Sequence, residues 1–344
     1  MGEVPAIRLD RLGKRFRVSQ REPGLRAALR ALFVRTHVEI DAVCELSFEV
    51  PQGQRVGLLG PNGAGKTTTL KMLAGLLHPT SGRAQVLGHE PARRSHELLR
   101  SIALVMGQKR QLSWDLPALD TYELNRVVFD VERSVHQLRL TELVELLELG
   151  EVVRKPVRTL SLGERMKCEL VAALLHGPRV LFLDEPTIGM DVAMQLALRD
   201  FVREHNRRTG ATVVLTSHYM EDVAALCERI LVIDGGRLRF DGSIEALVRR
   251  TRPLRRVSVR ADALPTDDEL RALGQVVERE PPRMALDVAP ERVPEAVARL
   301  LALPGSHDLA VADAPLEEVM RELFAMRAPE DEAGAEPSSR GSDA

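Results

Sequence analysis

A glycine-rich turn contains the residues of this sequence that are best suited to chemistry. Residues 60–67 read Gly-Pro-Asn-Gly-Ala-Gly-Lys-Thr and match the pattern G-x-x-x-x-G-K-[ST] at every fixed position. Glycine lets the backbone curl so that successive N–H groups point at one phosphate. Lys66 can reach the β- and γ-phosphates, and the Thr67 hydroxyl can bind Mg²⁺. The motif therefore predicts a site for a nucleotide and its magnesium ion.

The segments on both sides of this turn supply the context that the motif requires. An apolar run at 56–59 predicts a buried strand, and leucines at helical spacing after Lys66 predict a helix. The amino end of that helix adds the positive end of its dipole to the phosphate site. The predicted nucleotide-binding residues of the turn are Gly60, Pro61, Asn62, Gly63, Ala64, Gly65, Lys66, Thr67 and Thr68.

An acidic pair closes a second apolar run. Asp184 and Glu185 follow residues 180–183, which predict a fully apolar strand. An aspartate at a strand end can hold Mg²⁺ through water, opposite Thr67, and Glu185 is placed to polarise an attacking water. The alternative is an N-cap pair before Pro186, but the phosphate motif upstream favours the catalytic interpretation.

Two further polar residues follow predicted strands. Gln108 comes after the apolar run 102–106 and can bind Mg²⁺ or the attacking water. His218 comes after the β-branched run 212–216, where it can hydrogen-bond a γ-phosphate and sense its loss. Because ligands of parallel sheets bind at the carboxyl ends of the strands, we expect both side chains near the glycine-rich turn.

Residues 160–167, Leu-Ser-Leu-Gly-Glu-Arg-Met-Lys, open another predicted helix. Ser161 and Glu164 form the capping box S-x-x-E, which is a complete explanation of the pair as helix-end chemistry. A helix N-terminus capped by serine and glycine is also a phosphate site. The two interpretations are compatible.

Together these motifs resemble those of the ATP-binding subunit of an ABC transporter. The resemblance covers about residues 6–245 and is most specific at the signature, which lies between the glutamine loop and the acidic strand. In chain order the matching segments are Gly60–Thr67 for the phosphate loop, Gln108 for the glutamine loop, Leu160–Glu164 for the signature, Val180–Glu185 for the second phosphate-site motif, Met190–Asp191 for the aspartate loop and His218 for the switch histidine. Leu162 and Glu164 replace the Gly and Gln of the commonest signature, and the effect of Glu164 on the rate of hydrolysis stays open.

The resemblance implies an ATPase that works as a pair of subunits. Two subunits would close head to tail on two ATP molecules, with Ser161 and Gly163 of one touching the γ-phosphate held by the other. ATP would then hold the pair together, and hydrolysis would open it. Glu164 and Asp191 would belong to the same composite site. The implied roles are general base for Glu185, magnesium ligand for Thr67, Gln108 and Asp184, and switch for His218.

Phe16 stands where the family's adenine-stacking aromatic residue is expected. A place in the core of an early strand explains Phe16 nearly as well, because an insert at about 19–37 separates it from the rest of the fold. Within that insert, residues 23–35 carry apolar side chains on one helical face and arginines on another. Both a short packed helix and a basic amphipathic arm that docks near the membrane fit this pattern.

Several segments resemble one bacterial exporter group, of the viologen-exporter type. They are residues 107–117, the insert at 21–24 and the signature at 160–164, while residues 313–324 resemble a short module appended to many drug-exporter ATPases. The resemblance implies a second ATPase subunit, identical or homologous, an integral-membrane permease, and a place at the cytoplasmic face of the plasma (inner) membrane. Trp114 lies where such a subunit meets its permease, although packing inside a helical lobe would explain it equally.

The distribution of apolar runs predicts an α/β fold. Apolar strands that alternate with helices indicate a mostly parallel, P-loop NTPase-like sheet with helices on both faces. We also expect an antiparallel N-terminal β subdomain, in which residues 6–18 form a half-exposed strand pair, and an inserted helical lobe at about 110–175. The predicted domains are an ABC-type ATPase domain at 1–250, a small α/β accessory module at 251–327 and a disordered tail at 328–344.

The composition is typical of a soluble globular protein and argues against several classes. The formal net charge of −2 gives no electrostatic case for nucleic acid as a partner. No apolar run approaches the ~18 residues of a membrane-spanning helix, and the N-terminus lacks a signal-peptide core. Cys44, Cys168 and Cys227 have neither metal-ligand nor disulfide-scaffold spacing, so we expect reduced thiols in a cytosolic protein.

Three other functions use the same ATPase motifs. A soluble ABC-type ATPase of DNA repair or translation usually has two cassettes or a long coiled-coil insert, and neither occurs here. An import ATPase tends to carry a longer, all-β regulatory domain, whereas residues 255–327 look mixed and short. A polysaccharide-exporting ATPase carries a comparable basic insert before the phosphate loop. The prediction is an ATPase subunit that powers export through a permease, with polysaccharide export as the alternative.

Overall fold

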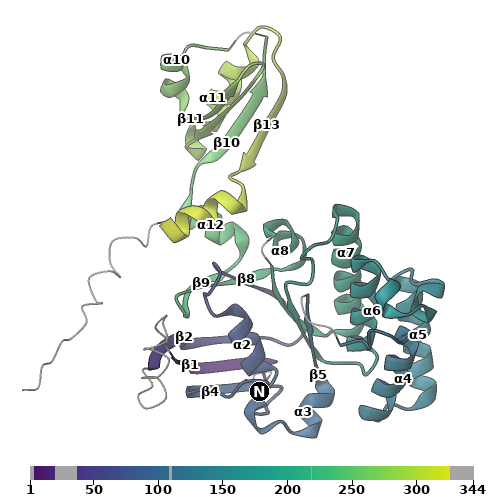
Figure 1. Ribbon diagram of the computed structural model, residues 1–344. Helices are drawn as coiled ribbons and strands as arrows, with labels where there is room; N and C mark the ends of the chain where they lie inside the picture. Colours follow the sequence, from purple (N-terminus) through teal and green to yellow (C-terminus); the bar gives the residue numbers. More distant parts are fainter. Residues whose placement is uncertain (1–3, 20–36, 108–110, 218, 263, 326–344) are drawn as a thin grey trace, which may run out of the picture. The chain divides into compact units, whose positions relative to one another are not determined.

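A computed structural model (Figure 1) describes residues 4–19, 37–107, 111–217, 219–262 and 264–325. The chain divides into two compact units, Met1–Asp241 and Gly242–Ala344. Within the described ranges, no helix has the length and apolar character needed to cross a lipid bilayer. Residues 20–36, which hold most of the predicted insert, and the predicted tail at 328–344 lie outside the described residues.

The first unit is built around a six-stranded sheet that holds the predicted site. Its strand order is β5-β6-β7-β3-β8-β9, and the pairs β5–β6, β6–β7, β3–β7 and β3–β8 are all parallel. Continuous apolar runs suit parallel strands that are buried on both faces, and every residue of β6 and β7 is buried. The strands are β3 (Arg55–Leu59), β5 (Ile102–Met106), β6 (Val180–Asp184), β7 (Thr212–Thr216), β8 (Arg229–Asp234) and β9 (Arg237–Gly242). The predicted α/β fold with a mostly parallel sheet is confirmed.

A second, antiparallel sheet of the first unit has the order β2-β1-β4 and comprises β1 (Ile7–Ser19), β2 (His37–Val50) and β4 (Ser81–Val86). The prediction of a strand pair within residues 6–18 is wrong, because these residues form the single strand β1. The register of β1 against β2 shifts between Leu9 and Leu12 and again before Arg15. Such irregularities change which side chains face the core, so the broken alternation reflects a kinked strand and not a turn.

Helices cover these sheets and form the inserted lobe (Figure 1). Leu70 and Leu73 of α2 share one buried core with Phe48 of the antiparallel sheet and Phe182 of the parallel sheet. The lobe consists of α4, α5 and α6, with the buried Tyr122 hydroxyl donating to the Cys168 carbonyl at 3.1 Å. The helices of the first unit are α2 (Lys66–Leu73), α3 (His96–Ser101), α4 (Ala118–Val128), α5 (Arg133–Leu146), α6 (Leu162–Leu174), α7 (Val192–Thr209) and α8 (Met220–Leu226).

The second unit contains a four-stranded antiparallel sheet of order β11-β12-β10-β13 with its own apolar core. The sequence did not predict α9 or β11. The strand β11 is Gln-Val-Val-Glu-Arg-Glu, an edge strand whose charged side chains hide the usual strand pattern. The elements are α9 (Ile244–Thr251), β10 (Arg255–Arg260), α10 (Asp267–Leu273), β11 (Gln275–Glu280), β12 (Arg283–Val288), α11 (Val293–Leu301), β13 (His307–Asp313) and α12 (Leu316–Ala325).

A charge cluster ties the end of α9 and the helix α12 to this sheet. The buried Asp287 carboxylate accepts ion-pair contacts from Arg252 at 2.6 Å and from Arg256 at 2.9 Å. Glu318 of α12 contacts the same two arginines at 2.6 and 2.7 Å. These contacts raise the pKa of Arg256 and lower that of Glu318. The cluster has a structural explanation, because a buried charge is tolerated only when it is paired.

Candidate nucleotide site

The phosphate loop connects the carboxyl end of β3 to the amino end of α2, and close packing excludes a side chain at two of its glycines. Gly60 and Gly65 have φ values of 155° and 102°. A Cβ on Gly60 would lie 2.1 Å from the Ile233 carbonyl oxygen, and one on Gly65 would lie 2.4 Å from that of Ala42. The first turn of α2 has no acidic residue, and no side chain caps it at Gly65. Its amide donors therefore suit an anion.

Lys66 is folded onto the loop that it follows. Its Nζ donates to the carbonyl oxygens of Gly60 at 2.7 Å and Pro61 at 3.0 Å. Only 6% of the residue is exposed. Burial lowers the pKa of Lys66, whereas the nearby carboxylates of Glu185 and Asp184 act in the opposite direction. The structure thus brings the predicted phosphate cation and the predicted acids together.

Three oxygen-bearing side chains meet at the carboxyl ends of β6 and β7. Thr67 Oγ1 donates to Asp184 Oδ1 at 3.1 Å, and Thr216 Oγ1 donates to the same oxygen at 2.7 Å. Oxygen donors are what Mg²⁺ prefers, and it commonly takes only one or two protein ligands alongside phosphate and water. Among the described residues, no three His, Cys, Asp or Glu side chains form a metal-holding group by themselves. Thr67 and Asp184 therefore fit a magnesium ion that a bound phosphate completes.

Glu185 is held in an unusual backbone conformation directly after β6. Its φ is +52°, which is uncommon for a residue other than glycine. Its backbone N–H donates to Oγ1 and to the carbonyl oxygen of Thr216, each at 3.0 Å. A Cβ on Gly107 would lie 2.3 Å from the Glu185 carbonyl oxygen, so residue 107 must be small. Backbone strain held in place by neighbours is typical of functional positions.

The signature residues form a separate group at the N-termini of α6 and α7. Ser161 and Glu164 make the complete capping box, with Glu164 N to Ser161 Oγ at 3.2 Å and Ser161 N to Glu164 Oε2 at 2.9 Å. The bond from the Ser161 backbone is the main reason that the pKa of Glu164 is lowered. A Cβ on Gly163 would lie 2.5 Å from Cε of Met194, whose backbone N–H donates to the Asp191 carboxylate at 2.8 Å.

Within one subunit, the signature residues and the phosphate loop form two separate groups of hydrogen bonds. Among the described residues, the side-chain hydrogen bonds of Ser161, Glu164 and Asp191 stay within their own helix ends and do not reach the loop. Phe16 lies half-buried on β1, paired with Ile40 of β2, and its ring lies under the Lys14 ammonium, 5.2 Å from the ring centroid. Gln108 and His218 lie outside the described residues. The predicted roles of these residues remain predictions.

Comparison with known proteins decides the family. Residues 43–188 match the ABC transporter family, and residues 253–312 match the C-terminal domain of EvrA-like ABC transporters. The chain is 31% identical over 208 residues to the ABC transporter ATP-binding protein NatA of Bacillus subtilis, covering 60% of this chain and 84% of that one. The chain belongs to the family of ABC transporter ATP-binding proteins. The expected ABC-type ATPase family is therefore confirmed.

Other members of the ABC family are similar over the same part of the chain. The daunorubicin resistance ATP-binding protein DrrA3 of Streptomyces coeruleorubidus is 38% identical over 206 residues, which span 60% of this chain and 65% of that relative. The Nod factor export ATP-binding protein I of Ralstonia nicotianae is 34% identical over 64% of this chain and 68% of its own. A dimeric ATP-binding cassette in a post-hydrolysis state with ADP and Pi has a TM-score of 0.57 at 22% identity, covering 69% of this chain and 98% of its own. That likeness supports the ABC fold.

Sequence patterns did not identify Thr216 and Asp222. Their side chains hydrogen-bond residues in and next to the predicted nucleotide site. Thr216 contacts both acids, as described above, and its only sequence signal is its place at the end of a β-branched run. Asp222 has no exposed surface. Its carboxylate accepts hydrogen bonds from Arg199 at 2.6 Å, Thr187 at 2.6 Å and Ser217 at 3.2 Å. Asp222 thereby links α8, α7 and the loops after β6 and β7.

Replacing Asp222 with asparagine should lower the free energy of unfolding by about 3 kcal/mol, because the Arg199 guanidinium loses its buried partner and keeps only the exposed Glu221 carboxylate, 3.5 Å away. Urea denaturation of both proteins measures the difference. Asp200→Asn is the matched control, since Asp200 pairs with Arg203 on the same helix but its side chain is 75% exposed. The control should change the free energy by less than about 1 kcal/mol. Equal effects of the two variants would contradict the importance of the buried cluster.

Proposed function

We propose that this chain binds and hydrolyses ATP to power transport, in the direction of export, through a separate membrane permease. The observation that carries the proposal is the convergence of Lys66, Thr67, Asp184 and Glu185 at one edge of the parallel sheet. Each of these side chains has a chemical type that phosphoryl transfer to water requires.

The residues divide the work of hydrolysis among themselves. The loop N–H groups and the Lys66 ammonium bind the phosphates, and Thr67 and Asp184 would hold Mg²⁺, which neutralises charge on the phosphate oxygens. Glu185 accepts a proton from water while the water oxygen attacks the γ-phosphorus and the bond to the ADP oxygen breaks. The hydrogen bonds from the Glu185 N–H to Thr216 hold the backbone of residue 185, and so the position of its Cβ.

A second ATPase subunit would complete the site. The signature N-terminus at Ser161 and Leu162 is exposed, so a partner's phosphate can reach it. The similar cassette with ADP and Pi is a dimer in its own structure. In our proposal, Ser161 and Gly163 of one subunit contact the γ-phosphate bound by the other. Whether the partner is identical or homologous depends on the transporter.

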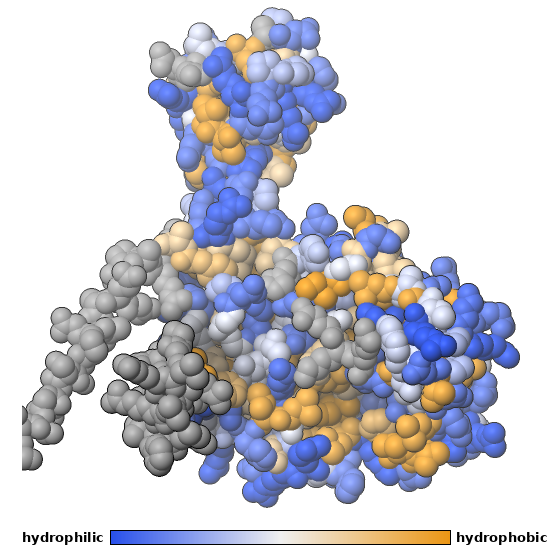
Figure 2. Space-filling model, viewed as in Figure 1, coloured by the Kyte–Doolittle hydropathy of each residue, from blue (hydrophilic) through white to orange (hydrophobic). Residues whose placement is uncertain are grey.

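Apolar surface on the helical lobe supports a permease as the other partner. Figure 2 shows hydrophobic residues gathered over the part of the molecule where Figure 1 places α4. Leu124, Val127 and Val128 of this helix are each at least 60% exposed, and Trp114 is 40% exposed. Part of the Trp114 side chain is therefore available to a partner, while the rest is buried. Contiguous exposed apolar residues mark interaction surfaces, and docking there would place the chain at the cytoplasmic face of the inner membrane.

The direction of transport is inferred from the relatives. Two similar proteins are named for daunorubicin resistance and for Nod factor export. The match of residues 253–312 to the C-terminal domain of EvrA-like ABC transporters extends the likeness into the second unit. Export is therefore the direction that we propose, with the permease selecting the substrate.

Ser161→Arg tests the proposed pair of subunits. We expect the variant to bind ATP with unchanged affinity but to form no ATP-dependent dimer in light scattering, because the bulky side chain would occupy the phosphate-facing helix end. Ser95→Arg is the matched control, since Ser95 is likewise an N-cap, accepting from Leu98 N, on α3. Both variants lose about 1 kcal/mol of capping, so only dimerisation should separate them. Normal dimerisation of Ser161→Arg would refute the composite site.

A further inference from the structure

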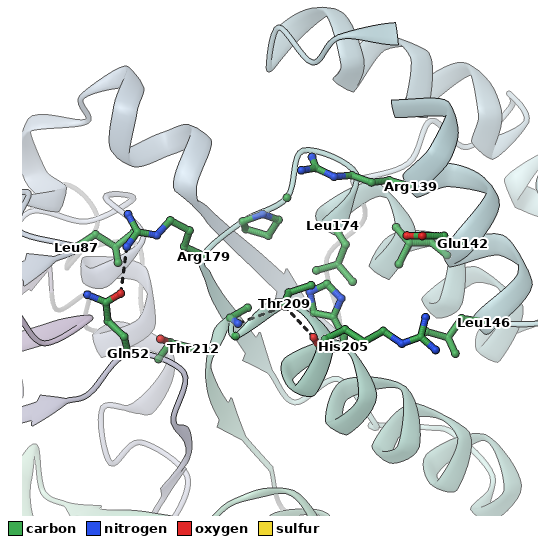
Figure 3. Close-up of a pocket in the computed structure, with 16 residues that line it drawn as sticks. Gln52, Leu87, Arg139, Glu142, Leu146, Leu174, Arg179, His205, Thr209 and Thr212 are labelled. Carbon is green, nitrogen blue, oxygen red and sulfur yellow. Dashed lines mark hydrogen bonds between the residues drawn. The ribbon is translucent and has the colours of Figure 1, made fainter. Parts of the chain in front are cut away.

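The first unit has a cavity of about 450 Å³ at the edge of the parallel sheet opposite the phosphate loop. Its lining includes Arg179, which immediately precedes β6, and Thr212, the first residue of β7. The amino ends of parallel strands lie at the edge away from their carboxyl ends, where the nucleotide site is. Other parts of the wall come from α5 of the helical lobe and from the end of α7, including His205 (Figure 3). The cavity is therefore separate from the ATP site.

Two arginines reach this cavity from different elements and contact neutral acceptors. Arg139 of α5 donates through Nη1 to the Leu175 carbonyl oxygen at 3.1 Å. Arg179 donates through Nη2 to Oε1 of Gln52 at 3.1 Å, on the opposite side of the cavity in Figure 3. A guanidinium carries five N–H donors. Each of these hydrogen bonds uses one N–H donor of an arginine. The acceptors are uncharged and do not neutralise the guanidinium charge, so both arginines can still bind an anion.

A glycine makes the position of Arg139 possible. Gly177 has a φ of +73°, and a Cβ there would lie 2.6 Å from both Nη atoms of Arg139. The guanidinium therefore lies directly against the backbone of the loop between α6 and β6. A side chain at residue 177 would push the cation out of the wall of the cavity, so the lining is shaped around it.

The charged lining of the cavity is mainly positive. Three arginines line it, namely Arg139, Arg179 and Arg208, against one acidic residue, Glu142. Arg208 forms an ion pair with Glu204, its neighbour on α7, at 2.5 Å. Among the described residues, Arg139 and Arg179 thus hydrogen-bond only uncharged acceptors, whereas the charge of Arg208 is paired with the Glu204 carboxylate.

Leucine side chains form an apolar part of the cavity wall, beside the polar Gln52, Thr209 and Thr212. Leu146 of α5, Leu174 of α6 and Leu87 of the turn after β4 line it, as Figure 3 shows. His205 belongs to the apolar part at neutral pH, because burial lowers its pKa to about 4 and the ring is then uncharged. The ring also stacks on Phe201, with ring centroids 5.9 Å apart. An occupant would need hydrocarbon to cover the leucines as well as an anion to meet the arginines.

We propose that this cavity binds an organic anion that carries one carboxylate on a hydrocarbon body. Small-molecule sites usually have volumes of roughly 300–1,000 Å³, apolar walls and a few polar groups that fix orientation. The carboxylate pairs with one of the lining arginines in charge-assisted hydrogen bonds, the other cations keep the cavity attractive to an anion, and the body covers the leucines. The bound anion contacts both the helical lobe and the sheet core, because α5 and the residues at the amino ends of β6 and β7 line the same cavity. The proposal does not depend on ATP hydrolysis.

Isothermal titration of the full chain with sodium decanoate tests this proposal. We expect saturable binding of one decanoate per chain, at least tenfold weaker binding of decan-1-ol, and no binding of acetate. Decan-1-ol has the hydrocarbon without the charge, and acetate has the charge without the hydrocarbon. Equal affinity for decanoate and decan-1-ol, or binding of acetate, would overturn the assignment. Absence of saturable decanoate binding to the wild type would overturn it as well.

Two variants and one control locate the anion. Arg179→Gln and Arg208→Gln should each weaken decanoate binding at least fivefold, because each removes a cation from the lining. Arg207→Gln is the matched control, since Arg207 pairs with the same Glu204 at 2.7 Å but does not line the cavity. All three side chains lie on the surface, so the variants should fold, which circular dichroism checks. Unchanged affinity in Arg179→Gln and Arg208→Gln, or an equal loss in Arg207→Gln, would overturn the proposal.

Discussion

Replacing Glu185 with glutamine should reduce ATP hydrolysis by about 10²–10⁴-fold, the usual contribution of a general base. The amide keeps the size of the side chain but cannot accept a proton from water. The backbone contacts of residue 185 with Thr216 do not involve the side chain, so the position of the residue should persist. Phosphate release measures the rate, and titration with a fluorescent ATP analogue should show retained binding.

The same variant should accumulate an ATP-bound dimer. If ATP holds two subunits together and hydrolysis separates them, a subunit that binds but does not hydrolyse stays closed. Light scattering with ATP present measures the dimer. Glu97→Gln is the control, because that side chain lies on α3 and is 79% exposed, and the control should hydrolyse ATP normally. A monomeric Glu185→Gln with normal turnover would refute both the general base and the ATP-driven dimer.

The parts of the site that the sequence predicted are those encoded by contiguous residues. The phosphate loop needs its glycines at fixed spacing between a strand and a helix, and the structure shows why Gly60 and Gly65 tolerate no side chain. Asp184 ends β6 after four apolar residues and Glu185 follows it, so their place at the sheet edge follows from strand length alone. A contiguous pattern of this kind determines the local backbone geometry, so the position of its residues can be predicted before any tertiary contact is known.

The parts that the sequence did not predict depend on contacts between distant segments. Thr216 matters because β7 lies beside β6, which brings its hydroxyl to Asp184. Asp222 looks like an ordinary acidic residue in the first turn of a helix, and only packing against Arg199 of α7 buries it. Nothing in the spacing of these residues indicates a shared cluster, so a single sequence could not have identified it.

Backbone irregularities account for the main error in the fold. Residues 6–18 lose their alternation where β1 kinks, and a positive φ of 44° at Arg11 accompanies the shift in register. A period-two pattern assumes a regular pleat, so a bulge looks like the end of a strand. The prediction of two strands therefore followed the pattern correctly and still failed.

Replacing Lys66 with alanine should weaken ATP binding by about 2–3 kcal/mol, which is on the order of 100-fold in affinity, because a charged hydrogen-bond partner of the phosphates is lost. The ammonium already lies in the loop, held by the carbonyl oxygens of Gly60 and Pro61. The carboxylates of Glu185 and Asp184 lie close enough to act on its pKa, so the cation also belongs to the site of the two acids. Equilibrium titration with a fluorescent ATP analogue measures the affinity.

A lysine elsewhere on the same helix separates binding from stability. Lys71 lies in the last turn of α2, away from the loop, so Lys71→Ala should leave the ATP affinity within about twofold of the wild type. Lys66→Ala also removes two hydrogen bonds that hold the loop, so thermal melting of both variants must accompany the titration. A folded Lys66→Ala with wild-type affinity would refute the phosphate site. A loss of ATP affinity in Lys66→Ala but not in Lys71→Ala would show that the loop binds the phosphates through the Lys66 ammonium. The proposed roles of Glu185, the signature and the second subunit all depend on that binding step.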